Sequence, residues 1–106
     1  MFARKVSMHL KPNSVAEFTQ RIEKEIIPLL RKQKGFQDEI TFVVAGGAEA
    51  VGISLWENAE NAEAYNRGSY QDVTKILGRV VDGAPKIETY DVANSTFHKI
   101  AAAVAV

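Results

Sequence analysis

The sequence contains no cysteine, which excludes disulfides, thiol nucleophiles, iron–sulfur clusters and cysteine-ligated zinc together. Histidine is nearly as scarce, since only His9 and His98 occur and they lie far apart in the chain. A structural metal site needs three or four ligands. We therefore expect no bound metal, and no cofactor.

An excess of charge is also missing, because 13 basic residues balance 13 acidic ones. Nucleic-acid binders and membrane-surface proteins usually carry basic clusters, so we expect neither partner. The apolar tail, residues 100–106, is far shorter than the roughly 20 residues of a membrane span. No signal peptide is visible after Met1, and these features favour a cytoplasmic protein.

No internal repeat or low-complexity linker divides the 106 residues, and 46% of them are hydrophobic. That length and composition suit one domain with its own core. We expect this domain to span residues 1–97. The tail, residues 98–106, is expected to pack on a partner subunit.

Alternation predicts a first strand over residues 2–10. Ser14 and Glu17 then match a capping box that opens a helix. An apolar stripe at helical spacing follows, and Pro28 within it predicts a bend. Gly35 is expected to end the helix. The stripe comprises Val15, Phe18, Ile22, Ile26 and Leu29.

Residues 36–45 are rich in β-branched and aromatic side chains and predict a second strand. Gly46 and Gly47 indicate a hairpin that leads to a third strand over residues 50–56. Asn58 is a good N-cap for the next helix.

That next helix is interrupted at Gly68 and Ser69, so we expect either a broken helix or two short ones. Residues 82–85 predict a turn, and residues 86–96 a fourth strand. The order β-α-β-β-α-β predicts an α+β, ferredoxin-like domain with a four-stranded antiparallel sheet and two helices on one face.

The second and third strands carry apolar residues on both faces, as Phe42, Val43, Leu55 and Trp56 illustrate. A sheet that is apolar on both faces is usually covered on both. The helices cover only one face, so we expect a second copy of the chain to cover the other, as in a symmetric homodimer. A monomer with a moderately apolar sheet is the alternative.

Two segments and the Gly-Gly hairpin carry a resemblance to a known family. The segments are PLLRKQKGFQDE (residues 28–39) and ISLWENAENAEAY (residues 53–65). With these, the chain resembles the antibiotic biosynthesis monooxygenase domain of the dimeric α/β barrel group, over about residues 2–96. The resemblance implies a homodimer with one pocket per subunit between helices and sheet.

The family includes cofactor-independent oxygenases of polycyclic phenols as well as haem-degrading enzymes. The haem-degrading members carry an Asn on the first strand, and a Trp and a haem-ligating His on the second helix. This chain has no Asn on its first strand, and has Tyr65 and Lys75 near the other two positions. We therefore reject haem degradation and expect a protein that could be an oxidoreductase of this monooxygenase type.

Four residues are candidates for a site. His9 could act as a general base, because its ordinary pKa lies near neutrality, or simply face solvent at a strand end. Trp56 could stack on a flat substrate or fill the core. Tyr65 and Tyr70, on either side of the helix break, could orient a phenol. Asp38 and Glu39 are interpreted as a solvated pair.

Two other functions stay open at this stage. A non-catalytic dimer could use the same pocket as a small-molecule-binding or stress-related module. An RNA-binding domain shares the order of elements, but its third strand normally carries aromatic and basic residues. Here that strand reads AVGISLW, which disfavours RNA.

Overall fold

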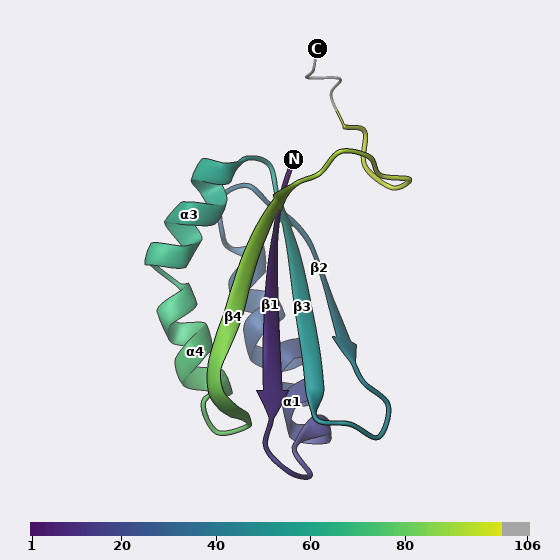
Figure 1. Cartoon of the computed structure of the whole chain (residues 1–106). Coiled ribbons are helices and arrows are strands. Elements are labelled where there is room, and N and C mark those ends of the chain that lie inside the picture. The colour runs from purple at the N-terminus through teal and green to yellow at the C-terminus, as the bar shows by residue number, and fades with distance from the viewer. Residues whose placement is uncertain (101–106) are drawn as a thin grey trace.

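The computed structural model describes residues 1–100. Its strands are β1 (Phe2–Leu10), β2 (Phe36–Val43), β3 (Glu49–Trp56) and β4 (Val81–Asp91). Its helical segments are α1 (Val15–Arg21), the π-helix η1 (Ile22–Ile26), α2 (Ile27–Arg31), α3 (Ala59–Arg67) and α4 (Tyr70–Leu77). The strands form one sheet in the order β2-β3-β1-β4, and every neighbouring pair is antiparallel. All helices lie on one face of it (Figure 1), which confirms the ferredoxin-like prediction.

Strand register places three polar residues in one row across the sheet. Arg4 on β1 pairs with Ser54 on β3, and Ser54 pairs in turn with Glu39 on β2. The next row toward the far end of β1 comprises Val6, Gly52 and Thr41. Because side chains alternate between faces along a strand, both rows point toward the helices.

The core lies between this face and the helices. Phe18 and Trp56 are completely buried there, and the apolar stripe predicted for the first helix supplies several of its neighbours. Burial of such side chains from water is the main favourable term in folding. The largest fully buried side chains are those of Trp56, Phe18, Leu10 and Val80.

The first helical crossover differs from its prediction in two details. Ser14 does precede the helix, but its φ of −105° and ψ of 0° turn the hydroxyl away, and that hydroxyl bonds the carbonyl of Pro12. The capping box is therefore wrong. The helix also ends at Arg31, before Gly35, which instead adopts a φ of +80°.

The bend expected at Pro28 takes the form of a π-helical turn. The amide of Ile27 donates to the carbonyl of Ile22 just before the proline. Proline lacks an amide donor and its ring crowds the preceding turn. A wider turn is a common way for a helix to absorb such a disruption.

The second crossover follows its prediction closely. Asn58 caps α3, because its Oδ1 accepts from the amide of Asn61 at 2.9 Å. The helix breaks at Gly68 and Ser69, and α4 begins at Tyr70.

The fourth strand begins earlier than predicted. Ser7 pairs with Lys86 but His9 pairs with Asp82, so residues 83–85 bulge out of β4 instead of forming a turn before it. Gly83 supplies a φ of +78° within this bulge. Pro85 has no backbone N–H and therefore leaves no donor unpaired where the ladder is interrupted. The strand also ends at Asp91 rather than at residue 96.

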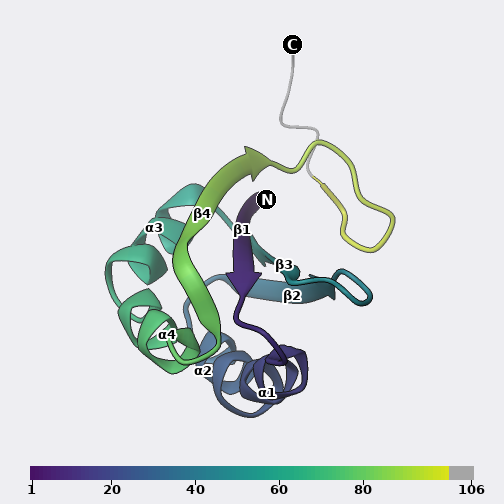
Figure 2. The same cartoon turned by 60° about the horizontal axis from the view of Figure 1, so that its bottom comes forward.

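After β4 the chain leaves the helices and runs toward the β2–β3 side of the sheet (Figure 2). There, His98 contacts Asp38 of the same chain. The tail that we expect on a partner subunit continues through residues 101–106, which lie outside the described residues. Within residues 1–100, no helix has the length and apolar character needed to cross a membrane.

Gly35 gives a direct test of this packing. A Cβ there would lie 2.2 Å from Oδ1 of Asn61, in addition to occupying a left-handed conformation. Gly46 has a similar φ of +71° with nothing within 4 Å of its would-be Cβ. We expect Gly46→Ala to lower the free energy of unfolding by about 1 kcal/mol, because of the left-handed conformation alone. Gly35→Ala should lower it by about 2 kcal/mol more than Gly46→Ala does, because its new Cβ overlaps Asn61. Urea unfolding measures both changes. Equal losses would contradict the close approach of Gly35 to α3.

Candidate functional site

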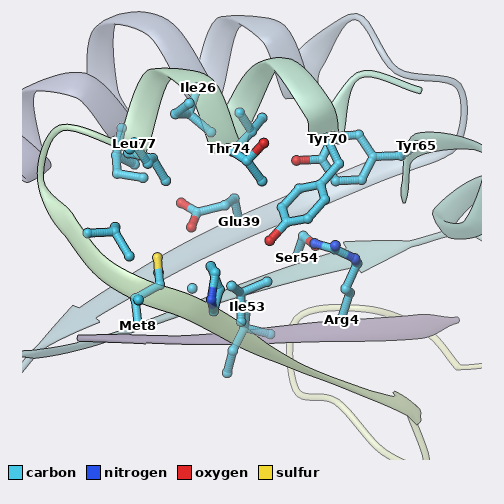
Figure 3. Close-up of a pocket in the computed structure, with 18 residues that line it drawn as sticks. Arg4, Met8, Ile26, Glu39, Ile53, Ser54, Tyr65, Tyr70, Thr74 and Leu77 are labelled. Carbon is cyan, nitrogen blue, oxygen red and sulfur yellow. The ribbon is translucent and has the colours of Figure 1, made fainter. Parts of the chain in front are cut away.

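A cavity of about 220 Å³ lies between the sheet and the helices. Its wall is mostly apolar and includes Val6, Met8, Ile22, Ile26, Val73 and Leu77. Six polar side chains also line it, namely those of Arg4, Glu39, Ser54, Tyr65, Tyr70 and Thr74. Figure 3 shows them converging on one space from the sheet below and from α3 and α4 above.

The size of this cavity suits a small ring system. An apolar cavity of about 150 Å³ is known to hold benzene in a protein interior, and 220 Å³ is larger by about half. Gly52 helps to keep the space open, because it has no side chain where its sheet row faces the helices. The cavity can therefore hold one aromatic ring with substituents, or two fused rings.

Arg4 is the most unusual residue of the site, because its side chain is charged and the residue is only 3% exposed. One terminal nitrogen donates to Oδ1 of Asn66 at 2.8 Å. The guanidinium also lies 4.0 Å from the ring centre of Tyr70 and 5.3 Å from that of Tyr65. Such cation–π contacts partly replace the water that the charge has lost.

Glu39 projects into the middle of the cavity (Figure 3). Burial raises the pKa of its carboxyl above the ordinary value of 4.5, and the hydroxyl of Thr41, which donates to it at 2.5 Å, partly opposes that shift. The interpretation of Glu39 as a solvated residue is therefore wrong. A carboxyl with a raised pKa takes up a proton from a ligand more readily than an ordinary carboxylate does.

Tyr65 and Tyr70 line the cavity together, as predicted from their positions beside the helix break. Their ring centres lie 5.9 Å apart. Burial, opposed by the Arg4 charge, raises the pKa of Tyr65 well above its ordinary value. Tyr65 thus remains a neutral phenol that can donate or accept a hydrogen bond.

Trp56, the third predicted binding residue, does not line the cavity. It is fully buried in the core, where its ring stacks on Tyr65 with centres 4.9 Å apart. Its indole Nε1 donates to the Ser54 hydroxyl at 2.9 Å. Trp56 therefore lies behind the cavity wall and holds two of its residues in place.

His9, the predicted base, lies outside the cavity. It is exposed, and its Nδ1 lies 2.7 Å from Oε1 of the exposed Glu49 across the β1–β3 ladder. On β1, the side chain of His9 points to the opposite face of the sheet from those of Arg4, Val6 and Met8. The structure thus brings together Tyr65 and Tyr70 but separates them from His9.

Arg4 could have been identified from the alternation of its strand, because it shares the parity of Val6 and Met8, which face the core. Glu39 could not, because it shares the more polar parity of β2 with Gln37 and Thr41. A charged residue on a core-facing parity is rare unless it is paired or functional. Strand parity alone, however, does not reveal that both residues lie in the same row.

The titration of Glu39 gives a second prediction. Because its folded-state pKa is raised, the folded protein holds this proton to a higher pH than the unfolded chain does. The contribution of Glu39 to stability is therefore fully present below pH 4.5 and is lost as pH rises through the raised pKa. We expect Glu39→Gln to lose less stability than the wild type between pH 4.5 and neutrality, as measured by thermal unfolding across pH.

The matched control for this measurement is Glu63→Gln, at an exposed position on α3. That variant should follow the wild-type pH profile. If Glu39→Gln also followed it, the carboxyl of Glu39 would not be buried as described.

Comparison with known proteins supports the fold. No protein-family model matches the chain, and no curated protein matches it. Several solved structures do match. A monooxygenase from the gene ActVA-Orf6 of Streptomyces coelicolor, in complex with the ligand nanaomycin D, is 16% identical with a TM-score of 0.71 over 92% of each chain.

Two further structures extend this similarity. A protein of unknown function from Nitrosomonas europaea is 15% identical with a TM-score of 0.72, over 92% of this chain and 94% of that one. A structure named antibiotic biosynthesis monooxygenase is 11% identical with a TM-score of 0.69, over 89% of this chain and 100% of that one. At these identities the likeness concerns the fold, and this chain has the fold of the antibiotic biosynthesis monooxygenases, the family that its sequence resembles.

Proposed function

We propose that this protein is a cofactor-independent monooxygenase that acts on a small aromatic or phenolic molecule bound in the cavity. The observation that carries the proposal is a largely apolar, ring-sized space that also holds a carboxyl with a raised pKa and two tyrosines. The Streptomyces monooxygenase of the same fold, which was solved with nanaomycin D bound, supports it.

The chemistry requires a substrate that supplies its own electrons. Removal of a proton from an activated CH₂ group beside a phenol leaves a carbanion that can reduce molecular oxygen. One oxygen atom then remains on the carbon as a ketone, and the other leaves as water with the two hydrogens. All four electrons come from the substrate, so the overall equation balances as R₂CH₂ + O₂ → R₂CO + H₂O.

In this scheme the protein supplies a base, orientation and a dry site. Glu39 is the base, since its carboxylate reaches the cavity and its raised pKa favours uptake of a proton. Tyr65 and Tyr70 orient the substrate by hydrogen bonds and ring contacts. His9 is exposed and does not line the cavity, so it is not assigned the role of base.

A non-catalytic binding module is the alternative, because the same cavity could hold an aromatic ligand without turnover. The two functions differ in oxygen consumption. Both predict that a bound ligand raises the melting temperature.

Oxygen uptake by the purified protein tests the proposal with a panel of one- and two-ring phenols that carry an activated CH₂ group. We expect uptake above the blank and formation of the ketone. We also expect Gly52→Leu to abolish it, because the new side chain would fill the cavity. A Cβ at residue 52 would meet its nearest atoms at 3.6 Å and 3.9 Å, which are ordinary contacts, so the variant should still fold.

Val51→Leu, which points to the other face of the sheet, is the matched control and should retain activity. A rise in melting temperature without oxygen uptake would favour the binding module. Neither response to any member of the panel would contradict both functions.

We also propose that the protein is a homodimer formed through the sheet face that the helices leave open. Ile40 and Phe42 on that face are 53% and 51% exposed, and Val51 and Ile53 adjoin them on β3. Exposed apolar side chains that adjoin on one face are typical of an interface. In a twofold dimer the patch would meet its own copy.

Light scattering combined with gel filtration tests this proposal. We expect the wild type to run as a dimer at micromolar concentration and Phe42→Lys to run as a monomer, because a lysine would be desolvated at the interface. Ile87→Lys is the control, since Ile87 is also exposed on the sheet but shares the helix-facing row of Val6. A monomeric wild type would refute the dimer.

A further inference from the structure

The guanidinium of Arg4 has no anionic partner among the described residues. The ion pairs within residues 1–100 involve Lys5, His9, Arg21 and His98 but not Arg4. Its hydrogen bond to Asn66 uses one of its five N–H donors. Every fully enclosed side-chain nitrogen or oxygen of these residues has a partner, so Nε and Nη1 of Arg4 are not fully enclosed, and Arg4 lines the cavity.

A buried cation in this position is costly unless something compensates it. Arginine cannot lose its proton at accessible pH, and an unpaired buried charge is strongly unfavourable. The rings of Tyr65 and Tyr70 compensate in part. Asn66 contributes a neutral oxygen, and the positive charge remains available to an anion that enters the cavity.

The charged and titratable groups around the cavity come from four elements: Arg4 from β1, Glu39 from β2, Tyr65 from α3 and Tyr70 from α4. Of these, Tyr65 and Tyr70 are phenols, and burial works against a negative charge on Tyr65 and Glu39. The cavity therefore favours a ligand that brings negative charge to Arg4.

We propose that Arg4 binds the anionic oxygen of a phenolate, and that the cavity thereby selects acidic phenols over neutral aromatic molecules. The ring lies in the apolar part of the cavity, the anionic oxygen accepts from the free N–H groups of Arg4, and the phenolic proton is released to solvent. This inference rests on the proposed function for its substrate class, and it assigns to Arg4 the choice among aromatic ligands.

A carboxylate on an aromatic ring shares the chemistry of an anionic oxygen, and the choice of probes separates the two. 4-Nitrophenol, nitrobenzene and 4-nitrobenzoate differ only in that group. The nitrophenolate absorbs visible light, so its binding and its protonation state can be followed directly. An electron-poor nitrophenol does not need to react with oxygen, so binding is measured apart from turnover.

We expect 4-nitrophenol to bind more tightly than nitrobenzene or 4-nitrobenzoate. Arg4→Met should weaken its binding about 10- to 100-fold, which corresponds to loss of hydrogen bonds to a charged group. The bound phenol should also lose its proton at a lower pH in the wild type than in Arg4→Met. A role of Arg4 in packing alone would not shift that titration.

The control is Arg67→Met, because Arg67 is exposed and directly follows Asn66 in the sequence. This variant should bind 4-nitrophenol like the wild type. Arg4→Lys keeps the charge and provides a second variant if Arg4→Met does not fold, as judged by circular dichroism. In Arg4→Lys, the bound phenol should still lose its proton at the low pH expected for the wild type.

Equal binding of nitrobenzene and nitrophenol, an unchanged titration in folded Arg4→Met, or a raised titration in folded Arg4→Lys would overturn the inference. Tighter binding of 4-nitrobenzoate would overturn the choice of a phenolate. Binding that depends on Arg4, without oxygen uptake on the earlier panel, would refute the monooxygenase while leaving this inference intact. Oxygen uptake that is unaffected in Arg4→Met would refute this inference and leave the monooxygenase intact.

Discussion

The burial of one permanent positive charge determines how the second crossover must be built. Arg4 points from the central strand β1 into the space beneath α3 and α4, where it is almost completely buried. Two aromatic faces and an amide oxygen surround it. On an uninterrupted helix, residues five apart are separated by about 140° around the axis, so Tyr65 and Tyr70 would point in different directions. The break at Gly68 and Ser69 lets both rings reach the same cation.

The space beside Arg4 exists because several elements avoid filling it. Gly52 leaves the centre of the sheet without a side chain, and the bulge at residues 83–85 moves the start of β4 out of regular register. Behind the wall, Trp56 stacks on Tyr65 and donates to Ser54, so it stiffens two lining residues without entering the cavity. A pre-formed, mostly apolar pocket with a few convergent polar groups is the usual form of a small-molecule site.

Much of this architecture follows from local patterns in the sequence. The strands, the Asn58 cap and the helix break at Gly68 were predictable, because each depends on short-range periodicity or on the backbone preference of one residue. The capping box at Ser14 failed because the backbone before α1 takes another conformation. The start of β4 was missed because Gly83 and Pro85 are typical of turns as well as of bulges.

The site was less predictable than the fold for a related reason. Tyr65 and Tyr70 could be identified from the helix break, but Arg4 and Glu39 lie in one row only through strand register, a long-range property that periodicity does not determine. His9 was a reasonable candidate on chemical grounds, and its parity directs it away from the cavity.

The central claim is that the cavity holds a phenolic ring with its oxygen on Arg4, and a crystal structure of the protein grown with an iodinated phenol tests it most directly. The account predicts anomalous density for iodine in the apolar part of the cavity, with the phenolic oxygen within hydrogen-bonding distance of the Arg4 guanidinium. An empty or collapsed cavity, or a ring bound with its oxygen turned away from Arg4, would contradict it.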